Sequence, residues 1–390
     1  MALLHHIARQ PLDPLPRLIL ADYLDECGAA ARAEFIRLQS QHLWEQLLSW
    51  EDDTSPTQRE RQLLSRHRAE WLKGLPKGLK WQFWGGLLEG VEIEEVGELE
   101  RARQHLDVRR VLWRVTQREN LLANLALLSS VVALHVSGRQ MGAAGVALLV
   151  HSPYVRELAV LNLWDNRIEA CGASTLANSP HLQSLVALHL GNNDIGNLGA
   201  AALAESPHLQ NLKVLNLRGN EIGPVGAAAL AQSPQFGQLA TLDLSHNRIG
   251  PTGAVALTNS ALLQNLTTLN LQGNAIGDEG VATLVASPHL QTLTTLELGG
   301  NGIGDEGVAA LAASPHLQKL TTLILWNNRI STEGAKALAQ SPFLQNLVTL
   351  KLEGNLIGDE GWSALRKSPY LRRCRSDFRR KKGRGTAGLS

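Results

Sequence analysis

An asparagine that recurs at one fixed spacing constrains this chain more than any other feature. It returns every 27 residues, at Asn166, Asn193, Asn220, Asn247, Asn274, Asn301, Asn328 and Asn355. One step earlier, around Arg139, the segment HVSGRQMG is a degenerate copy of the same unit. A period of this length is typical of an array in which each unit packs only against its neighbours. The sequence therefore predicts nine repeats, over residues 133–375.

The residues around this asparagine predict a strand followed by a sharp turn. Leucines stand five and three residues before it. Because side chains alternate along a strand, both leucines point to one side and face the core. At the turn, a buried asparagine amide offers both donors and an acceptor to backbone groups that lack strand partners. We therefore expect the eight asparagines to form a structural ladder through the array.

A short helix is expected after each turn. Asp278, Asp305 and Asp359 stand in GDEG segments, where we expect them to be helix N-caps. Most units close with Ser-Pro-x-Leu-Gln. We expect this proline to end the helix, because it disfavours helical geometry in the residue before it. The alanine-rich helices, such as VAALAAS, leave room for close packing between neighbouring units.

Together these positions give the motif LxLxxNxIGxxGxxxL, which resembles the leucine-rich repeats of the ribonuclease-inhibitor type. The resemblance implies an α/β solenoid, a horseshoe of nine 27-residue units. Parallel strands would line its concave face and short helices its convex face. The even period departs from the alternating repeat lengths of ribonuclease inhibitor, so identity with that protein is not implied.

Residues 1–80 predict a separate helical domain. Helical spacing is present over 18–27 and 31–48, and Ser55-Pro56-Thr57-Gln58 is typical of a capping box with proline at the first helical position. The segments PRLILADYLDECG and RAEFIRLQ resemble the N-terminal repeat-companion domain found beside repeat arrays in certain large-genome bacteria. This resemblance implies a bacterial origin and an array partner, and it implies no activity.

Both ends of the array are expected to be covered, because terminal repeats would otherwise expose their core. Residues 81–132 predict irregular capping repeats, with strands over 87–94 and 109–115. At the other end, Trp362 replaces the Ala or Val of every earlier unit and can cover the last core.

The positions four and two residues before each asparagine are expected to point away from the core, on the concave face. They vary while the framework stays constant. We expect a partner to be held there by Trp164, Trp326, His189, Asn216, Arg218, Asp243, Asn270, Glu297, Lys351 and Glu353. Exposed tryptophans are typical interface anchors. Trp164 and Trp326 lie six units apart, roughly 29 Å at about 4.8 Å per strand, which favours a protein or long peptide over a small metabolite. The alternative is that these side chains only pack on their neighbours.

Charge and cysteine content give weaker guidance. The chain has 37 basic and 36 acidic residues, but eight basic residues and one acid lie between Arg372 and Arg384. Residues 376–390 are expected to form a basic, disordered tail. Three distant cysteines without a CxxC pair indicate a reducing compartment, and we expect a cytoplasmic monomer. No uninterrupted apolar run reaches about 18 residues, so no membrane span is expected.

Catalytic and metal chemistry find little support in the sequence. His181, His208, His289 and His316 share one repeat position. Duplication of the SPHLQ turn explains them better than a metal site, because no carboxylate or thiol repeats beside them. P-loop, GxSxG, HExxH and GxGxxG contexts are missing from the sequence. We therefore expect no catalytic residue, no metal and no cofactor.

These observations favour a non-catalytic protein-binding scaffold or regulator that uses the concave face. One alternative is a modulator of a hydrolase, either an inhibitor or a GTPase-activating surface, for which only analogy of fold speaks. Another is a nucleic-acid-associated factor that contacts polyanions weakly through Arg372 to Arg384.

Overall fold

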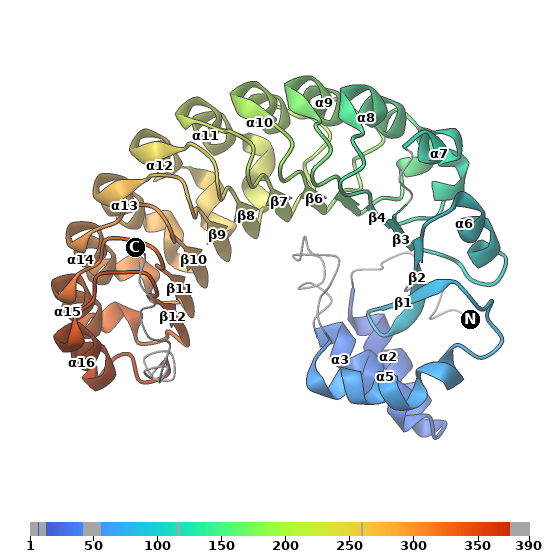
Figure 1. Ribbon diagram of the computed structural model, residues 1–390, viewed down its shortest axis with the longest axis horizontal. Helices are drawn as coiled ribbons and strands as arrows, with labels where there is room; N and C mark the ends of the chain where they lie inside the picture. Colours follow the sequence, from blue (N-terminus) through green and yellow to red (C-terminus); the bar gives the residue numbers. More distant parts are fainter. Residues whose placement is uncertain (1–6, 8–12, 42–55, 115–117, 259, 375–390) are drawn as a thin grey trace, which may run out of the picture. The chain divides into compact units, whose positions relative to one another are not determined.

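The computed structural model describes Ile7 and residues 13–41, 56–114, 118–258 and 260–374. Two compact units make up the chain. The first comprises Met1–Asp194 and Ser206–Asn216, and the second comprises Ile195–Glu205 and Leu217–Ser390. In the repeats of each unit, strands line one side and helices the other (Figure 1).

The first unit begins with three helices, α2 (Leu15–Glu26), α3 (Ala30–Gln41) and α5 (Gln58–Trp71). Helices α2 and α3 pack on each other through Ala21, Ala33 and Ile36. Arg17 of α2 is fully buried and donates hydrogen bonds to the carbonyl of Trp84, at 3.3 Å, and to the carboxylate of Glu89, at 2.9 Å. This buried pair ties the helices to the strands that follow.

The start of α5 corrects the predicted capping box by two residues. The cap is Thr57, whose hydroxyl accepts the N–H of Glu60 at 3.2 Å, while the Glu60 carboxylate accepts the N–H of Thr57 at 2.6 Å. A carboxylate at the third helical position makes a charge-assisted bond that Gln58 cannot offer to Ser55. Ser55 and residues 42–48 of the second predicted helix lie outside the described residues.

The sheet of the first unit keeps the strands in chain order. Its strands are β1 (Lys80–Trp84), β2 (Leu87–Ile93), β3 (Arg110–Trp113), β4 (Ala133–His135), β5 (Val160–Asn162), β6 (Ala187–His189) and β7 (Val214–Asn216). The first pair is antiparallel and the later pairs are parallel. The strands predicted over 87–94 and 109–115 are confirmed as β2 and β3. The repeat pattern does not predict β1, which pairs antiparallel and lies outside the 27-residue period.

Short helices connect these strands. They are α6 (Val96–Arg103), α7 (Arg118–Ala123), α8 (Gly142–Val150) and α9 (Glu169–Ala177), with 3₁₀ helices η1 (Leu125–Leu128) and η2 (Pro153–Val155).

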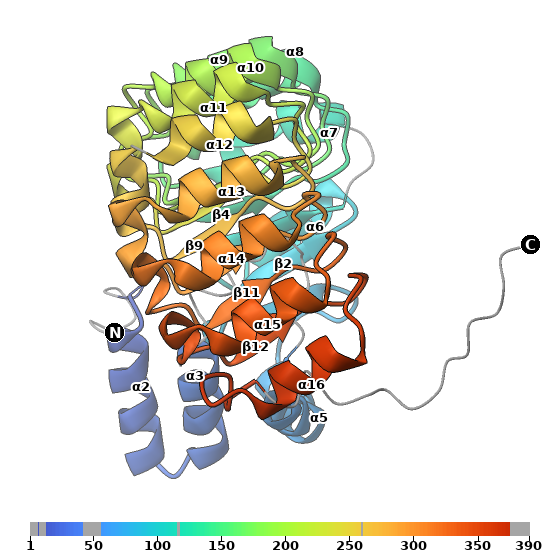
Figure 2. The ribbon, with the colours of Figure 1, turned by 90° about the vertical axis from the view of Figure 1, so that its left-hand side faces the viewer.

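The second unit repeats one strand–helix pattern. Its strands are β8 (Thr241–Asp243), β9 (Thr268–Asn270), β10 (Thr295–Glu297), β11 (Thr322–Ile324) and β12 (Thr349–Lys351). Its helices are α10 (Gly196–Ala204), α11 (Pro224–Ala231), α12 (Gly250–Thr258), α13 (Gly277–Val285), α14 (Asp305–Ala313), α15 (Thr332–Gln340) and α16 (Asp359–Lys367). Its 3₁₀ helices are η3 (Pro234–Gln238), η4 (Ala261–Asn265), η5 (Pro288–Thr292), η6 (Pro315–Leu317) and η7 (Pro342–Leu344). Figure 2 shows helices α12 to α16 side by side in chain order. The fold is thus the predicted α/β solenoid.

The repeated leucines and the asparagine share the interior of each unit. Leu242, Leu244, Ile249 and Leu257 are fully buried. Asn247 lies beside them at 7% exposure. Its amide nitrogen donates to the carbonyls of Leu217 and Leu244, both at 2.9 Å, and of Ser245 at 3.2 Å. Its oxygen accepts the N–H groups of Asn220 and Ile222 in the preceding unit, both at 2.9 Å. One side chain therefore satisfies backbone groups in the turns of two adjacent repeats.

A second ladder runs through the serines that follow the repeat helices, in the Ser-Pro segments and in Ser260-Ala261. The Ser287 hydroxyl accepts the N–H of His289 at 3.3 Å and so caps its own 3₁₀ helix. It also donates to the carbonyl of Thr258, the last residue of α12 in the preceding repeat, at 2.5 Å. The same donation to the preceding unit is made by Ser179, Ser206, Ser233, Ser260, Ser314, Ser341 and Ser368. The serines recur every 27 residues in the sequence, but the expectation that the proline ends the helix does not predict this hydrogen bond between repeats.

The aspartates expected as N-caps act on the next helix instead of their own. Asp278 is the second residue of α13, and its Oδ1 accepts the N–H groups of Gly304 and Gly307 at 2.7 and 3.0 Å. These groups lie at the start of α14. Asn197, Asp305 and Thr332 cap the following helices α11, α15 and α16 in the same way. Asp359, at the equivalent position, is the first residue of α16 rather than its cap.

The residue at this capping position determines the backbone conformation of the turn before the helix of the next repeat. Where it is polar, the next helix begins after an extended residue, such as Gly304 with φ −100° and ψ −160°. Where it is Ala or Pro, the turn of the next repeat has a residue in the left-handed backbone conformation instead. An example is Gly277 with φ +66°, whose N–H donates to the carbonyl of Asn301 at 3.0 Å. The left-handed form follows Ala143, Ala170, Pro224 and Pro251. The two forms therefore reflect whether the preceding unit supplies a side-chain acceptor.

Replacing Asn247 by alanine tests the asparagine ladder. Because Asn247→Ala leaves buried backbone groups of two turns unsatisfied, we expect a loss of about 1–3 kcal/mol in the free energy of unfolding. Denaturant titration measures it. Asn346→Ala is the control, since that exposed amide makes one bond to a carbonyl. Equal midpoints for Asn247→Ala and the wild type would contradict the ladder.

The Asp305 cap predicts a pH dependence. Burial raises the pKa of Asp305, but hydrogen bonds from Ser331 and Gly334 outweigh it and lower the pKa overall. The cap therefore stabilises the fold fully above the ordinary aspartate pKa, about 3.9, and this stabilisation is lost as the pH falls through the lower folded-state pKa. We expect Asp305→Ala to cost about 1 kcal/mol at pH 7. Urea midpoints at pH 7 and pH 3 should show the gap to wild type narrowing in acid; a constant gap would exclude an ionised cap.

Candidate functional site

The predicted partner-binding residues lie on the side of the strands opposite the core, here called the sheet face. The first unit carries Trp164, His189 and Asn216. The second unit carries Arg218, Asp243, Asn270, Glu297, Trp326, Lys351 and Glu353. Trp164 and Trp326 thus belong to different units, each with its own part of the face.

Several of these side chains are less exposed than the alternation of the strand predicts. His189 is 0% exposed, Asn216 3% and Asp243 8%. The cause is local for the carboxylate: Oδ1 of Asp243 accepts the N–H of Ser245 at 2.8 Å. Asn270 accepts the N–H of Gln272 in the same way at 3.1 Å. The position four residues before the asparagine therefore also supports the turn.

Each tryptophan of the face packs over a glycine that follows the strand of an adjacent repeat. The Trp164 ring occupies the space that a side chain at Gly191 would need. A Cβ placed on Gly299 would lie 2.7 Å from Cε2 of Trp326. Both tryptophans are half-buried. The alternative that these rings pack on their neighbours is thus partly realised, while each ring keeps a solvent-facing part.

Two carboxylates with raised pKa values lie on the face of the second unit. Burial raises the pKa of Asp243, against hydrogen bonds from Ser245 that lower it. Burial also raises the pKa of Glu297, and the charge of Asp243 adds to this effect. The Gln272 amide donates to Glu297, and the charge of Arg218 favours ionisation of both acids. The arrangement is a partly desolvated polar strip whose side chains hold one another in place.

The far end of this face has a different character. Ile324 and Lys351 are half-buried, and Glu353 is exposed. Together with Trp326 they give the last two strands an aromatic, an aliphatic and two charged groups within reach of a partner.

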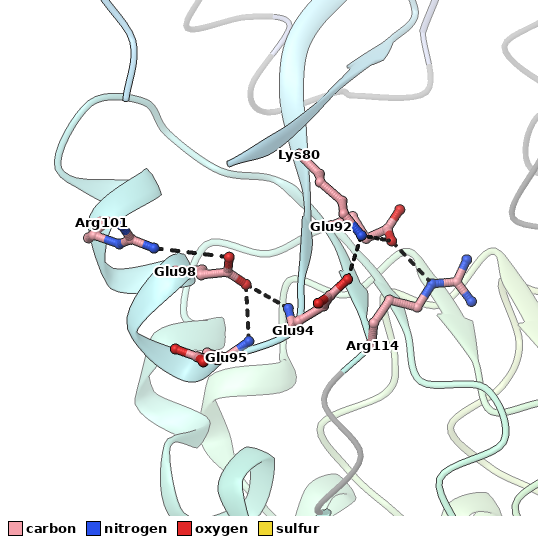
Figure 3. Close-up of polar contacts among 7 residues, drawn as sticks. All are labelled: Lys80, Glu92, Glu94, Glu95, Glu98, Arg101 and Arg114. Carbon is pink, nitrogen blue, oxygen red and sulfur yellow. Dashed lines mark hydrogen bonds and ion pairs between the residues drawn. The ribbon is translucent and has the colours of Figure 1, made fainter. Parts of the chain in front are cut away.

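A second cluster of polar side chains lies at the first strands of the sheet (Figure 3). The Lys80 ammonium contacts the carboxylates of Glu92 and Glu94 at 3.2 and 2.5 Å, and Nε of Arg114 lies 3.7 Å from Glu92. The hydrogen bond from Lys80, together with its charge, lowers the pKa of Glu94. A cavity of about 460 Å³ is lined by Glu92, Glu94, Glu95 and Arg114. These opposite charges neutralise one another, as in a solvated ion-pair network.

The remaining acids of Figure 3 have a structural task. The Glu98 carboxylate accepts the N–H groups of Glu94 and Glu95 at 2.6 and 3.0 Å, which completes a capping box for α6. Arg101 lies 4.0 Å from Glu98. This group therefore fixes the strand–helix junction.

The repeated histidines make contacts within the turns. Nδ1 of His181 accepts from Arg156 at 3.3 Å, and Gln264 lies 3.3 Å from Nδ1 of His289. In the described part of the chain, no group of three or more His, Cys, Asp or Glu side chains could hold a metal ion. None of the helices described is long and apolar enough to cross a membrane. Of the basic tail, Arg372 and Arg373 are exposed, and residues 375–390 lie outside the described residues.

The raised pKa of Glu297 gives a test of the strip. A carboxyl whose folded-state pKa lies above its unfolded value of about 4.3 destabilises the fold where it is ionised. We therefore expect Glu297→Gln to raise the urea midpoint at pH 7, with the gain shrinking as the pH falls toward about 4. Glu353→Gln, an exposed change on the same face, should leave the midpoint unchanged. A lower midpoint for Glu297→Gln at pH 7 would mean that its charge is fully compensated.

Comparison with known proteins agrees with the repeat geometry. A family model described as leucine-rich repeat matches residues 181–204, 208–231, 239–257, 263–285, 289–312, 316–339 and 343–365. No curated protein sequence matches the chain.

Three solved structures resemble the chain at low sequence identity. An internalin from Listeria monocytogenes is 21% identical, with a TM-score of 0.45, over 71% of this chain and 69% of the internalin. The ectodomain of the Arabidopsis receptor kinase HAESA, in complex with a peptide hormone, is 20% identical with a TM-score of 0.36, over 58% of this chain and 35% of its own. TLR13 in its complex with ssRNA13 is 20% identical with a TM-score of 0.42, over 70% of this chain and 39% of its own. The matched repeats and the order of strands and helices together show that the chain folds as an α/β leucine-rich-repeat solenoid.

Proposed function

We propose that this chain is a non-catalytic scaffold or regulator that holds a protein or a long peptide on its sheet face. The observation that carries the proposal is the arrangement of variable side chains on a rigid strand framework. Framework positions repeat unchanged, whereas the outward positions differ from strand to strand and contact one another. Gln272 holds Glu297, and Trp326 packs over Gly299. A surface fixed before binding loses little side-chain entropy when a partner arrives.

The chemistry of the face favours a macromolecular partner. Half-buried tryptophans combine apolar area with few rotatable bonds, as in the anchors of protein interfaces. The mixed charges of Arg218, Glu297, Lys351 and Glu353 provide specificity more than affinity.

The finer identity of the chain belongs to the same proposal. We place its repeats in the ribonuclease-inhibitor type, since the motif LxLxxNxIGxxGxxxL recurs and an α-helix follows the strand of each repeat. Residues 1–80 would be a repeat-companion domain of bacterial origin. A cytoplasmic monomer is consistent with three free cysteines, of which Cys374 is buried. Modulation of a hydrolase, and polyanion contact through Arg372 to Arg384, are the competing functions.

Peptide selection tests this proposal without a known partner. A phage-displayed library of random peptides is selected on the full chain, and the affinities of the winners are measured for Trp164→Ala, Trp326→Ala and Glu353→Ala. We expect at least one of the two tryptophan variants to lose about 2 kcal/mol or more of binding free energy, because the ring is a contact anchor. Trp326→Phe, which keeps an aromatic ring over Gly299, should retain most of the affinity.

The controls separate binding from folding. Glu279→Ala changes an exposed helix-side residue of α13 and should bind every winner as the wild type does. Thermal melts of each variant are needed, because truncating Trp326 also removes its packing on Gly299. Winners whose affinity is the same in all four sheet-face variants would move the interface away from this face.

A further inference from the structure

The N-terminal helices contain a cation that has no counter-charge among the described residues. Arg32 is the third residue of α3 and stands first in the RAEFIRLQ segment. Its guanidinium carbon lies 4.7 Å from the ring centre of Trp71 and 4.9 Å from that of Phe83. Among the described residues, no hydrogen-bond acceptor reaches its Nη1, which is buried. Two aromatic faces attract the cation but offer no oxygen to its N–H groups.

Neighbouring arginines of the same region have carboxylate partners. Arg37 pairs with Asp22 and Asp25, both at 2.8 Å. Arg59 pairs with Glu34 at 2.6 Å.

The fully buried Arg17 has Glu89 at 2.9 Å. Arg32 therefore differs from these three arginines, and burial of an unpaired charge is costly.

The surroundings of Arg32 add to its positive potential. It lies in the first turn of α3, which has no acidic residue there, and cations are disfavoured at this end of a helix. Burial lowers the pKa of Arg32 to about 10, so the group stays charged at neutral pH.

Arg32, Trp71 and Phe83 are all half-buried, so each keeps part of its side chain in contact with solvent. The ring centres of Trp71 and Phe83 lie 5.8 Å apart with planes at 74°.

We propose that the corner formed by Arg32, Trp71 and Phe83 is a binding site for a carboxylate, carried by a small acid or by an acidic side chain of a peptide. A carboxylate matches the guanidinium fork with two parallel hydrogen bonds. Its single negative charge leaves a neutral pair against the aromatic rings. A phosphate monoester carries about 1.5 to 2 negative charges and would leave an excess charge in an apolar corner. This site is separate from the sheet face and does not depend on the function proposed for it.

The indole N–H signal of Trp71 reports on this site directly. The full chain is labelled with ¹⁵N-tryptophan, and Trp71→Phe assigns the signal. Titrations at constant ionic strength use sodium acetate, a neutral peptide with one glutamate, the same peptide with glutamine, sodium chloride and inorganic phosphate. Acetate and the glutamate peptide should shift the signal with saturation, and chloride and the glutamine peptide should not. Acetate saturation alone assigns the site to small acids, and saturation by both probes includes peptide side chains.

Variants at Arg32 decide whether this group binds the carboxylate. Arg32→Met should abolish the saturable shift. Arg32→Lys keeps the charge but loses the fork, so we expect at least about a tenfold weaker half-saturation, equivalent to about 1.4 kcal/mol. A saturable shift that survives in Arg32→Met would overturn the proposal, as would saturation by phosphate at lower concentration than by acetate.

Thermal stability provides an independent readout. Without added carboxylate, Arg32→Met should melt above the wild type, because it removes an unpaired charge. Arg17→Met is the matched control and should melt below the wild type, because it strands Glu89. Acetate should raise the melting temperature of the wild type and leave that of Arg32→Met unchanged. A lower melting temperature for Arg32→Met would show that the charge is already compensated within the fold, which contradicts the site.

Discussion

A buried carboxamide at each turn is the interaction on which the rest of this array depends. The strand of a repeat is only three residues long, so the backbone groups of the turn that follows it need partners beyond those of the strand pairing. Asn247 satisfies carbonyls of its own turn and N–H groups of the preceding turn with one side chain. Because each asparagine serves two repeats, no turn in the array satisfies all of its backbone hydrogen bonds by itself. Stability is thus a property of neighbouring pairs, as expected for a solenoid.

The sheet face depends on the same short strands. Strands that stand side by side in register bring outward side chains close enough to contact one another, so the face holds a set of mutually fixed groups. Gly191 and Gly299 leave space that Trp164 and Trp326 fill. The Asp243 carboxylate is held by the backbone of its own strand end. These contacts reduce exposed area, but they also fix the positions of the groups that remain accessible.

The period of the sequence was enough to predict the solenoid, its strands and the buried asparagines, because a fixed spacing carries its own register. It did not predict which helix each polar cap serves. Asp278 was assigned to its own helix, since capping rules consider one segment at a time, and it caps the next one. Alternation along the strand assigned Asp243 to the outward face but could not indicate its burial, which depends on a hydrogen bond at the strand end and on crowding by neighbouring strands. Arg32 has no distinguishing mark in the sequence, because its missing partner is a fact of three-dimensional packing.

Because the capping residue of one repeat sets the turn of the next repeat, these contacts affect how such arrays change in evolution. A repeat boundary drawn at the strand would separate Asp278 from Gly304 and Gly307, the groups that it caps. Duplicating or deleting one whole repeat can therefore place an alanine before a turn that needs an acceptor, or an aspartate before a turn that bonds elsewhere. The contact from Asp278 to Gly307 spans more than one 27-residue period, so a cut at any point in the array separates a capping residue from a group that it caps. Gain or loss of a repeat is consequently tolerated best where the neighbouring repeats carry the same kind of capping residue.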